Sequence, residues 1–74
     1  MIDLRRQFGE NVRNFRTNLK LSQEGFAELC GLHRTYISGV ERGVRNPTLT
    51  IVVQIAEALK IHPAELLRGG GDGT

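Results

Sequence analysis

Apolar residues recur at helical spacing along most of this chain. Between residues 3 and 19 an apolar position appears every three or four residues, which predicts an amphipathic helix with one buried stripe. That stripe consists of Leu4, Phe8, Val12, Phe15 and Leu19. Asp3 is placed to cap the start of this helix, and Lys20 lies near its end, where a cation suits the helix dipole.

A second, shorter helix is predicted from Ser22, a good N-cap, to Leu29. Glu24 falls in its first turn, where a negative charge is favoured. Gly25 is an interior misfit that costs up to about 1 kcal/mol relative to alanine. Gly31 then interrupts the pattern, because glycine adopts the left-handed conformation that ends a helix without a Cβ penalty.

A third helix is expected to begin near His33 or Arg34 and to end before Gly43, with residues 44–47 as a loop. Small or apolar residues stand on both sides of the glycine turn, where two crossed helices must touch: Phe26, Ala27, Cys30, Leu32, Ile37 and Val40. This spacing is typical of a helix-turn-helix, with its short and often glycine-containing turn.

The remaining pattern predicts two more helices. Thr48 can cap the fourth, and Pro63 permits a last short helix that ends at Arg68. The inward stripe of the fourth helix is expected to be Leu49, Val52, Val53, Ala56 and Leu59. The apolar content of the last helix is Ala64, Leu66 and Leu67.

The predicted fold class is therefore all-α, with five compact helices in one domain over residues 1–68. A chain of 74 residues hides only about 60% of its unfolded surface, so a small core and no large enclosed active site are expected. The Gly-rich tail, residues 69–74, has nothing to bury and is expected to be disordered.

Composition narrows the class of partner only modestly. The formal net charge of +2 is too small to indicate nucleic acid by itself, so the placement of the charges must decide. Eight of the ten basic residues are arginine, which makes bidentate contacts with phosphate and guanine edges. This bias favours DNA.

The single cysteine, Cys30, excludes an internal disulfide and suits a reducing cytoplasm. No apolar run approaches the roughly 20 residues that span a bilayer, and the start, MIDLRRQFGEN, lacks the apolar core of a secretory signal. We expect a soluble cytoplasmic protein with no membrane partner.

The second helix of a helix-turn-helix lies in the major groove of DNA. With Ile37 and Val40 facing inward, the outward positions are Arg34, Thr35, Ser38, Gly39 and Arg42, with Tyr36 at the flank. Arg34 is the best candidate for a bidentate guanine contact. Thr35 can touch a thymine methyl group or a phosphate, and Ser38 a base edge or a backbone oxygen.

Each of these residues also has a simpler interpretation. Arg34 and Arg42 can be solvated on an exposed helix face, and Tyr36 can pack its ring on the protein with its hydroxyl in water. Inside this motif DNA contact is favoured for Arg34, whereas the alternatives remain open for Arg42 and Tyr36.

Other candidate contacts lie outside the third helix. Gln23 begins the second helix, where backbone N–H groups and an amide can meet a phosphate, although it can equally have no such role. Arg45 and Asn46, with Thr48 at the next helix start, can clamp the DNA backbone, or the loop cation can be merely solvated.

Arg16 and Glu41 are interpreted as a structural pair. A carboxylate at the end of the DNA-facing helix opposes DNA unless a cation neutralises it, and Arg16 of the first helix is the partner available.

The segment LSQEGFAELCGLHRTYISGVERGVRNPTL resembles the DNA-binding domain of the phage-repressor, or Cro/C1-type, helix-turn-helix family. The resemblance extends from Phe8 to about Leu67. It implies a five-helix repressor-like fold, a glutamine that contacts DNA at Gln23, and an arginine–glutamate pair between helices at Arg16 and Glu41.

Within that family, RTYISGVERGVRNPT is similar to the controller proteins of restriction–modification systems and also to many other small repressor-like regulators. The controllers are homodimers that bind paired operators and regulate their own gene and the endonuclease gene. Gly25 and His33 depart from the family pattern. The departure at Gly25 bears on the rigidity of the second helix, and the departure at His33 bears on the cap of the third.

A homodimer on a palindromic operator is expected, because so small a domain contacts only a few base pairs. The candidate self-complementary patch is Ile51, Ile61, Ala64 and Leu67. Ile61 and Leu67 can instead complete the core of the monomer. RNA polymerase is a further partner to consider for a transcription regulator.

Two other classes of function carry less support. An antitoxin-like protein-interaction module with secondary DNA binding would need chain outside the DNA-binding domain, and almost none remains. An enzyme is disfavoured because His33 and His62 have no ligand or base partner at suitable spacing, and Cys30 lies on an apolar face. No metal, cofactor or small-molecule ligand is expected.

Overall fold

The computed structural model describes residues 3–69, and in this range it contains five helical elements. They are α1 (Leu4–Asn18), α2 (Gln23–Cys30), α3 (Arg34–Glu41), α4 (Leu49–Leu59) and the 3₁₀ helix η1 (Pro63–Leu67). The predicted all-α class is confirmed, with a 3₁₀ helix as the last element. Residues 70–74 of the predicted tail lie outside the described residues.

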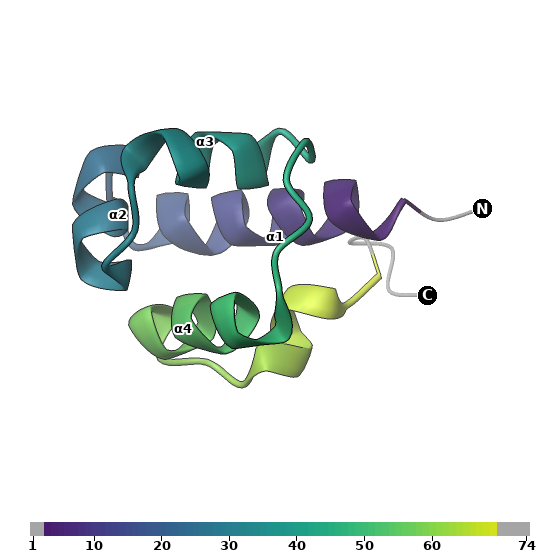
Figure 1. Ribbon diagram of the computed structural model, residues 1–74. Coiled ribbons are helices and arrows are strands. Elements are labelled where there is room, and N and C mark those ends of the chain that lie inside the picture. Colours follow the sequence, from purple (N-terminus) through teal and green to yellow (C-terminus); the bar gives the residue numbers. More distant parts are fainter. Residues whose placement is uncertain (1–2, 70–74) are drawn as a thin grey trace.

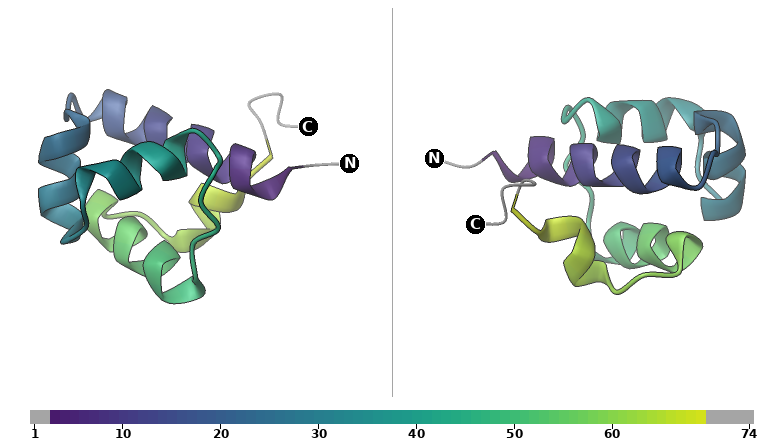
Figure 2. Two further views of the ribbon diagram at one scale, coloured as in Figure 1. Left: turned by 45° about the horizontal axis from the view of Figure 1, so that its top comes forward. Right: turned by 180° about the vertical axis from the view of Figure 1, so that it is seen from behind.

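The long helix α1 forms the centre of the arrangement (Figure 1). It packs against α3 on one side and against η1 on the other, while α2 contacts both α3 and α4 at one end. The view from behind shows the same order, with α3 and α4 on opposite sides of α1 (Figure 2, right). As a result, α3 has an inner face held by α1 and α2 and an outer face free of other helices.

Side chains from all five elements meet in one apolar core. The buried residues are Phe8, Val12, Phe26, Ala27, Cys30, Ile37, Val40, Val52, Ile55, Ala56, Leu59 and Leu66. No polar or charged side chain is fully buried among the described residues. The core therefore depends on apolar burial, at roughly 25 cal/mol per Å² removed from water.

The helices begin at the predicted caps. The side chains of Asp3, Ser22 and Thr48 each accept a backbone N–H from the first turn of the helix that follows. Amide side chains satisfy carbonyl groups at helix ends, since Asn11 donates to the Leu66 carbonyl and Gln54 to the Cys30 carbonyl. These bonds hold η1 against α1 and the end of α2 against α4.

The predicted apolar stripes are only partly correct. Leu4 and Leu19, the first and last positions of the predicted stripe of the first helix, are 59% and 53% exposed. On α4 the inward face is formed by Val52, Ile55, Ala56 and Leu59, so Ile55 was missed. Leu49 and Val53, predicted to face inward, are 82% and 42% exposed.

The α1–α3 contact is close because one residue has no side chain. Gly9 is buried, and an ideal Cβ built on it would lie 2.1 Å from the Val40 carbonyl oxygen and 2.9 Å from that of Glu41. These are backbone atoms at the end of α3, which cannot move aside without shifting the helix. Gly9 therefore determines how near α3 lies to α1.

Replacing Gly9 by alanine is expected to lower the free energy of unfolding by about 3 kcal/mol, since the added methyl group must push two helices apart. Urea unfolding followed by circular dichroism measures this. Gly69→Ala is the control, because a Cβ at Gly69 meets nothing within 4 Å. Equal unfolding midpoints for the two variants would contradict the close contact.

Candidate nucleic-acid interface

The turn between α2 and α3 is a tight glycine-ended cap. Gly31 adopts φ 73°, and the amide of Leu32 donates to the Ala27 carbonyl at 2.9 Å. His33 precedes α3 in an extended conformation, and its side chain makes no capping hydrogen bond. The turn thus holds the two helices in a helix-turn-helix, while the start of α3 has no side-chain cap.

The faces of α3 follow the predicted division with one exception. Ile37 and Val40 are buried, whereas Arg34, Thr35 and Arg42 are exposed. Ser38 and Tyr36 are half-buried at the edges. The outer face therefore presents guanidinium and hydroxyl groups, and a helix about 10–12 Å across matches a major groove about 12 Å wide.

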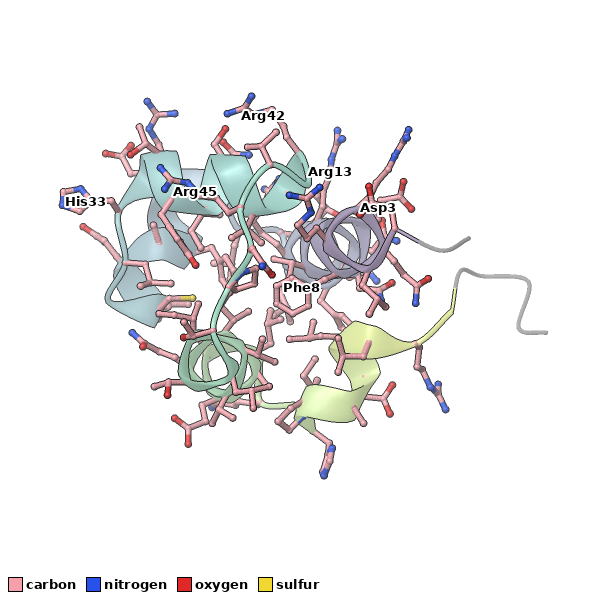
Figure 3. All side chains as sticks on the ribbon, turned by 45° about the vertical axis from the view of Figure 1, so that its right-hand side comes forward. Asp3, Phe8, Arg13, His33, Arg42 and Arg45 are labelled. Atoms are coloured by element: carbon pink, nitrogen blue, oxygen red, sulfur yellow. The ribbon has the colours of Figure 1, made fainter. Side chains whose placement is uncertain are left out.

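The exception is Gly39, which was predicted to be an outward position. It is buried, because the side chain of Arg45 returns from the following loop and lies over it. The Arg45 guanidinium carbon then lies 5.3 Å from the centre of the Tyr36 ring. Figure 3 shows Arg45 lying across α3 and Arg42 extending outward at the end of that helix.

An ion pair fixes the end of α3 to α1. Arg16 donates to both carboxylate oxygens of Glu41, with Nε–Oε2 at 2.6 Å and Nη2–Oε1 at 3.0 Å. The side chains are only 11% and 4% exposed. Arg16 also donates to the Leu21 carbonyl at 2.7 Å, so the expected pair is present and extends to the α1–α2 connection.

Gln23 joins this network instead of pointing freely outward. Its amide nitrogen donates to Glu41 Oε1 at 3.0 Å, and the residue is half-buried. This bond uses one of the two N–H donors of the amide, so a DNA contact by Gln23 can come from the second N–H, from the side-chain carbonyl oxygen or from the backbone amides beside it. This constraint was not visible in the sequence.

The loop before α4 contributes exposed polar groups. Arg45, Asn46 and Thr48 are exposed. The Thr48 hydroxyl accepts the amide of Ile51 at 3.2 Å, so this oxygen is engaged in capping α4. Of the three, Arg45 is the one that the structure brings onto α3.

The arginines divide into two groups. Four form ion pairs with carboxylates: Arg5 with Asp3, Arg6 with Glu10, Arg16 with Glu41 and Arg68 with Glu65. Within residues 3–69 the remaining four have no carboxylate partner: Arg13, Arg34, Arg42 and Arg45. Three of these lie on α3, at its end or across it, so the uncompensated positive charge gathers at this helix.

Arg13 is the candidate that sequence reasoning missed. It is exposed on α1, one turn after Gly9, which contacts the end of α3. Figure 3 shows it on α1 near the end of α3 that carries Arg42. The sequence shows a glycine four residues before Arg13. Only the packing of α1 on α3 reveals that this glycine marks the close contact between the two helices and that Arg13 lies one turn beyond it.

The predicted dimer patch is only partly exposed. Ile51 and Ile61 are half-buried and pack against the core, so they serve the monomer to a larger extent than expected. Ala64 is exposed and Leu67 is 47% exposed. Leu49 and Val53, one turn apart on α4, are further exposed apolar residues outside the predicted patch.

The cysteine of this chain, Cys30, is free and buried in the core. Burial raises the pKa of the Cys30 thiol to about 11, which keeps the thiol protonated near neutral pH. Residues 3–69 contain no group of three or more His, Cys, Asp and Glu side chains arranged to hold a metal ion. In the same part of the chain, no helix has the length and apolar character that crossing a membrane requires.

Comparison with known proteins agrees with this fold. The helix-turn-helix family matches residues 12–66. Control protein C.SmaI of Serratia marcescens is 46% identical over 70 residues, covering 95% of this chain and 83% of the relative. The chain belongs to the Cro/C1-type helix-turn-helix family, and controller proteins are among its relatives.

Solved structures give the same result. The controller protein C.AhdI from Aeromonas hydrophila superposes with a TM-score of 0.81 at 48% identity, covering 84% of this chain and 94% of that one. The C.Esp1396I controller, solved as a tetramer with its natural 35 base-pair operator, superposes with a TM-score of 0.76 at 29% identity, covering 88% and 96%.

Replacing Glu41 by alanine is expected to lower the free energy of unfolding by about 3 kcal/mol, because Arg16 is left with an uncompensated charge in a nearly buried site. Thermal and urea unfolding measure the loss. Glu10→Ala, which removes the exposed partner of Arg6, should change stability by less than about 0.5 kcal/mol. Similar losses in both variants would argue against the structural role of the Arg16–Glu41 pair.

Proposed function

We propose that this protein is a sequence-specific DNA-binding transcriptional regulator that acts as a homodimer, and that it is a controller of a restriction–modification system. In this role residues 1–68 form the DNA-binding domain, and the protein works in the cytoplasm, where its operator is. The regulated genes would be its own gene and that of the endonuclease.

One observation carries the proposal. The arginines without carboxylate partners gather at α3, the second helix of a helix-turn-helix, whose opposite face is anchored in the core. Of the other described arginines, all but Arg13 on α1 are paired with acidic residues. Exposed, uncompensated guanidinium groups on a helix of this kind suit phosphates and guanine edges.

The relatives support the same conclusion. The similarity to C.SmaI and C.AhdI extends over most of each chain, so it includes α3 and the loop after it. C.Esp1396I, with the same fold, forms a tetramer on a 35 base-pair operator. We infer that this chain also binds a paired operator as an oligomer.

The candidate residues have distinct roles in this proposal. Arg34 and Thr35, exposed in the first turn of α3, contact base edges, and Ser38 supplements them. Arg42, Arg45 and Asn46 add contacts along the end of α3 and the loop. Tyr36, Gln23 and Thr48 contribute through the groups that their internal contacts leave free.

The dimer surface is proposed on the other side of the molecule. Leu49 is 82% exposed and, with Val53, Ala64 and Leu67, presents apolar side chains on α4 and η1. Large exposed apolar side chains in neighbouring positions mark interaction surfaces. A two-fold dimer through them would present two copies of α3 to half-sites about one turn, roughly 34 Å, apart.

Replacing Arg34 by alanine should weaken binding to the preferred operator by about 1–3 kcal/mol and relax specificity at one base position. Arg45→Ala should instead lower, by about one, the slope of the logarithm of the binding constant against the logarithm of the salt concentration. A selection from random-sequence DNA followed by salt titrations measures both. The matched control is Arg5→Ala, which removes an arginine that is paired with Asp3. If Arg34→Ala binds DNA as Arg5→Ala does, Arg34 does not contact a base. If the unmodified protein selects no preferred sequence from the random pool, the proposed function is rejected.

Replacing Leu49 by glutamate should shift the protein towards monomer, because a charge would enter the proposed apolar interface. Sedimentation equilibrium measures the dissociation constant. Leu29→Glu is the control, since Leu29 is also exposed, at 60%, but lies on α2. A dimer unaffected by Leu49→Glu would place the interface elsewhere.

A further inference from the structure

The outer face of α3 carries an arginine that does not belong to the helix. Arg45 is in the loop between α3 and α4, yet its aliphatic part lies on Gly39 and its guanidinium lies over the ring of Tyr36. Gly39 and Tyr36 are three residues apart and share one side of the helix. The Arg45 side chain therefore runs back along α3 towards its N-terminus (Figure 3).

The lack of a side chain at Gly39 makes this course possible. An ideal Cβ on Gly39 would lie 2.8 Å from Arg45 Cγ and 3.1 Å from Arg45 Nε. Gly39 follows Thr35 by one turn on the outward face, where any side chain would otherwise be open to water. It is buried all the same, because Arg45 covers it.

The backbone fixes the origin of the Arg45 side chain as well. Gly43 adopts φ 79°, and the amide of Val44 donates to the Gly39 carbonyl at 3.0 Å. This glycine-ended cap ties the residue before Arg45 to the same Gly39 that its side chain covers. The backbone beside Arg45 and the aliphatic part of its side chain are therefore both held against one turn of α3.

We propose that Gly39 is a positioning residue for DNA binding, whose bare Cα, together with the Tyr36 ring, forms a seat that holds Arg45 on the outer face of α3 before DNA arrives. This inference rests on the proposed function. The seat consists of Gly39 and Tyr36, and its occupant is the Arg45 side chain.

The seat orders the side chain without neutralising it. A cation over an aromatic ring keeps its charge and its N–H donors at the edge of the guanidinium plane. Within residues 3–69 no carboxylate pairs with Arg45 to compete with a phosphate or a base. Because an arginine normally loses rotamer freedom on binding, a side chain already ordered in the free protein binds more tightly.

Gly39→Ala tests the seat, because the clash is with a flexible side chain and not with backbone. The helix itself tolerates alanine better than glycine, so the melting temperature should not fall. The first measurement uses the free protein. Tyr36 is the sole tyrosine, and its ring should shift the NMR resonances of the Arg45 guanidinium group upfield in the unmodified chain but not in Gly39→Ala. Unshifted Arg45 resonances in the unmodified chain would overturn the seat.

The second measurement is a double-mutant cycle on the selected operator. Gly39→Ala should weaken binding about three- to tenfold in the unmodified background. In the Arg45→Ala background the same change should weaken binding less than about twofold, since no side chain remains to be displaced. Equal losses in both backgrounds would show that alanine disturbs DNA directly, and this would overturn the positioning role.

The two proposals fail in different ways. If the unmodified protein selects no operator, the proposed function and the positioning role are both rejected, even where the Arg45 shifts are seen. If it selects an operator and Gly39→Ala binds that operator as tightly as the unmodified protein does, only the positioning role is rejected.

Discussion

The contact between α1 and α3 is the constraint on which the rest of this molecule depends. Gly9 allows the backbone of α1 to approach the last carbonyl groups of α3, and the Arg16–Glu41 ion pair closes the same contact at one edge. A helix of eight residues has little stability of its own. Its direction, and hence the face it presents to a partner, is set by this packing.

The same contact explains how an acidic residue is tolerated beside a surface that must meet an anion. Glu41 is neutralised by Arg16 and receives a third hydrogen bond from Gln23. Its charge is therefore directed into the protein, and the guanidinium groups of Arg34 and Arg42 remain exposed. A low net charge of +2 is compatible with DNA binding because four of the eight arginines are paired with carboxylates, which leaves Arg34, Arg42 and Arg45 uncompensated at α3.

Much of the fold followed from local pattern. Each of the caps Asp3, Ser22 and Thr48, and the left-handed Gly31, acts through atoms within a few residues of itself, so each was predictable. The ends of the apolar stripes were not. Leu4 and Leu49 keep the helical spacing but are exposed, and Ile55 is buried whereas Val53, which was predicted to face inward, is exposed. Periodicity gives the spacing of a stripe, whereas the partner helix decides its width and limits.

By itself, the sequence determined the helical order, the helix caps and the glycine turn, since spacing and residue type specify these locally. Only the tertiary structure decided which arginines lack a carboxylate partner, that Gln23 bonds to Glu41, and that Arg45 leaves its loop to cover Gly39. These facts depend on distances between side chains whose helices meet only after the core has formed.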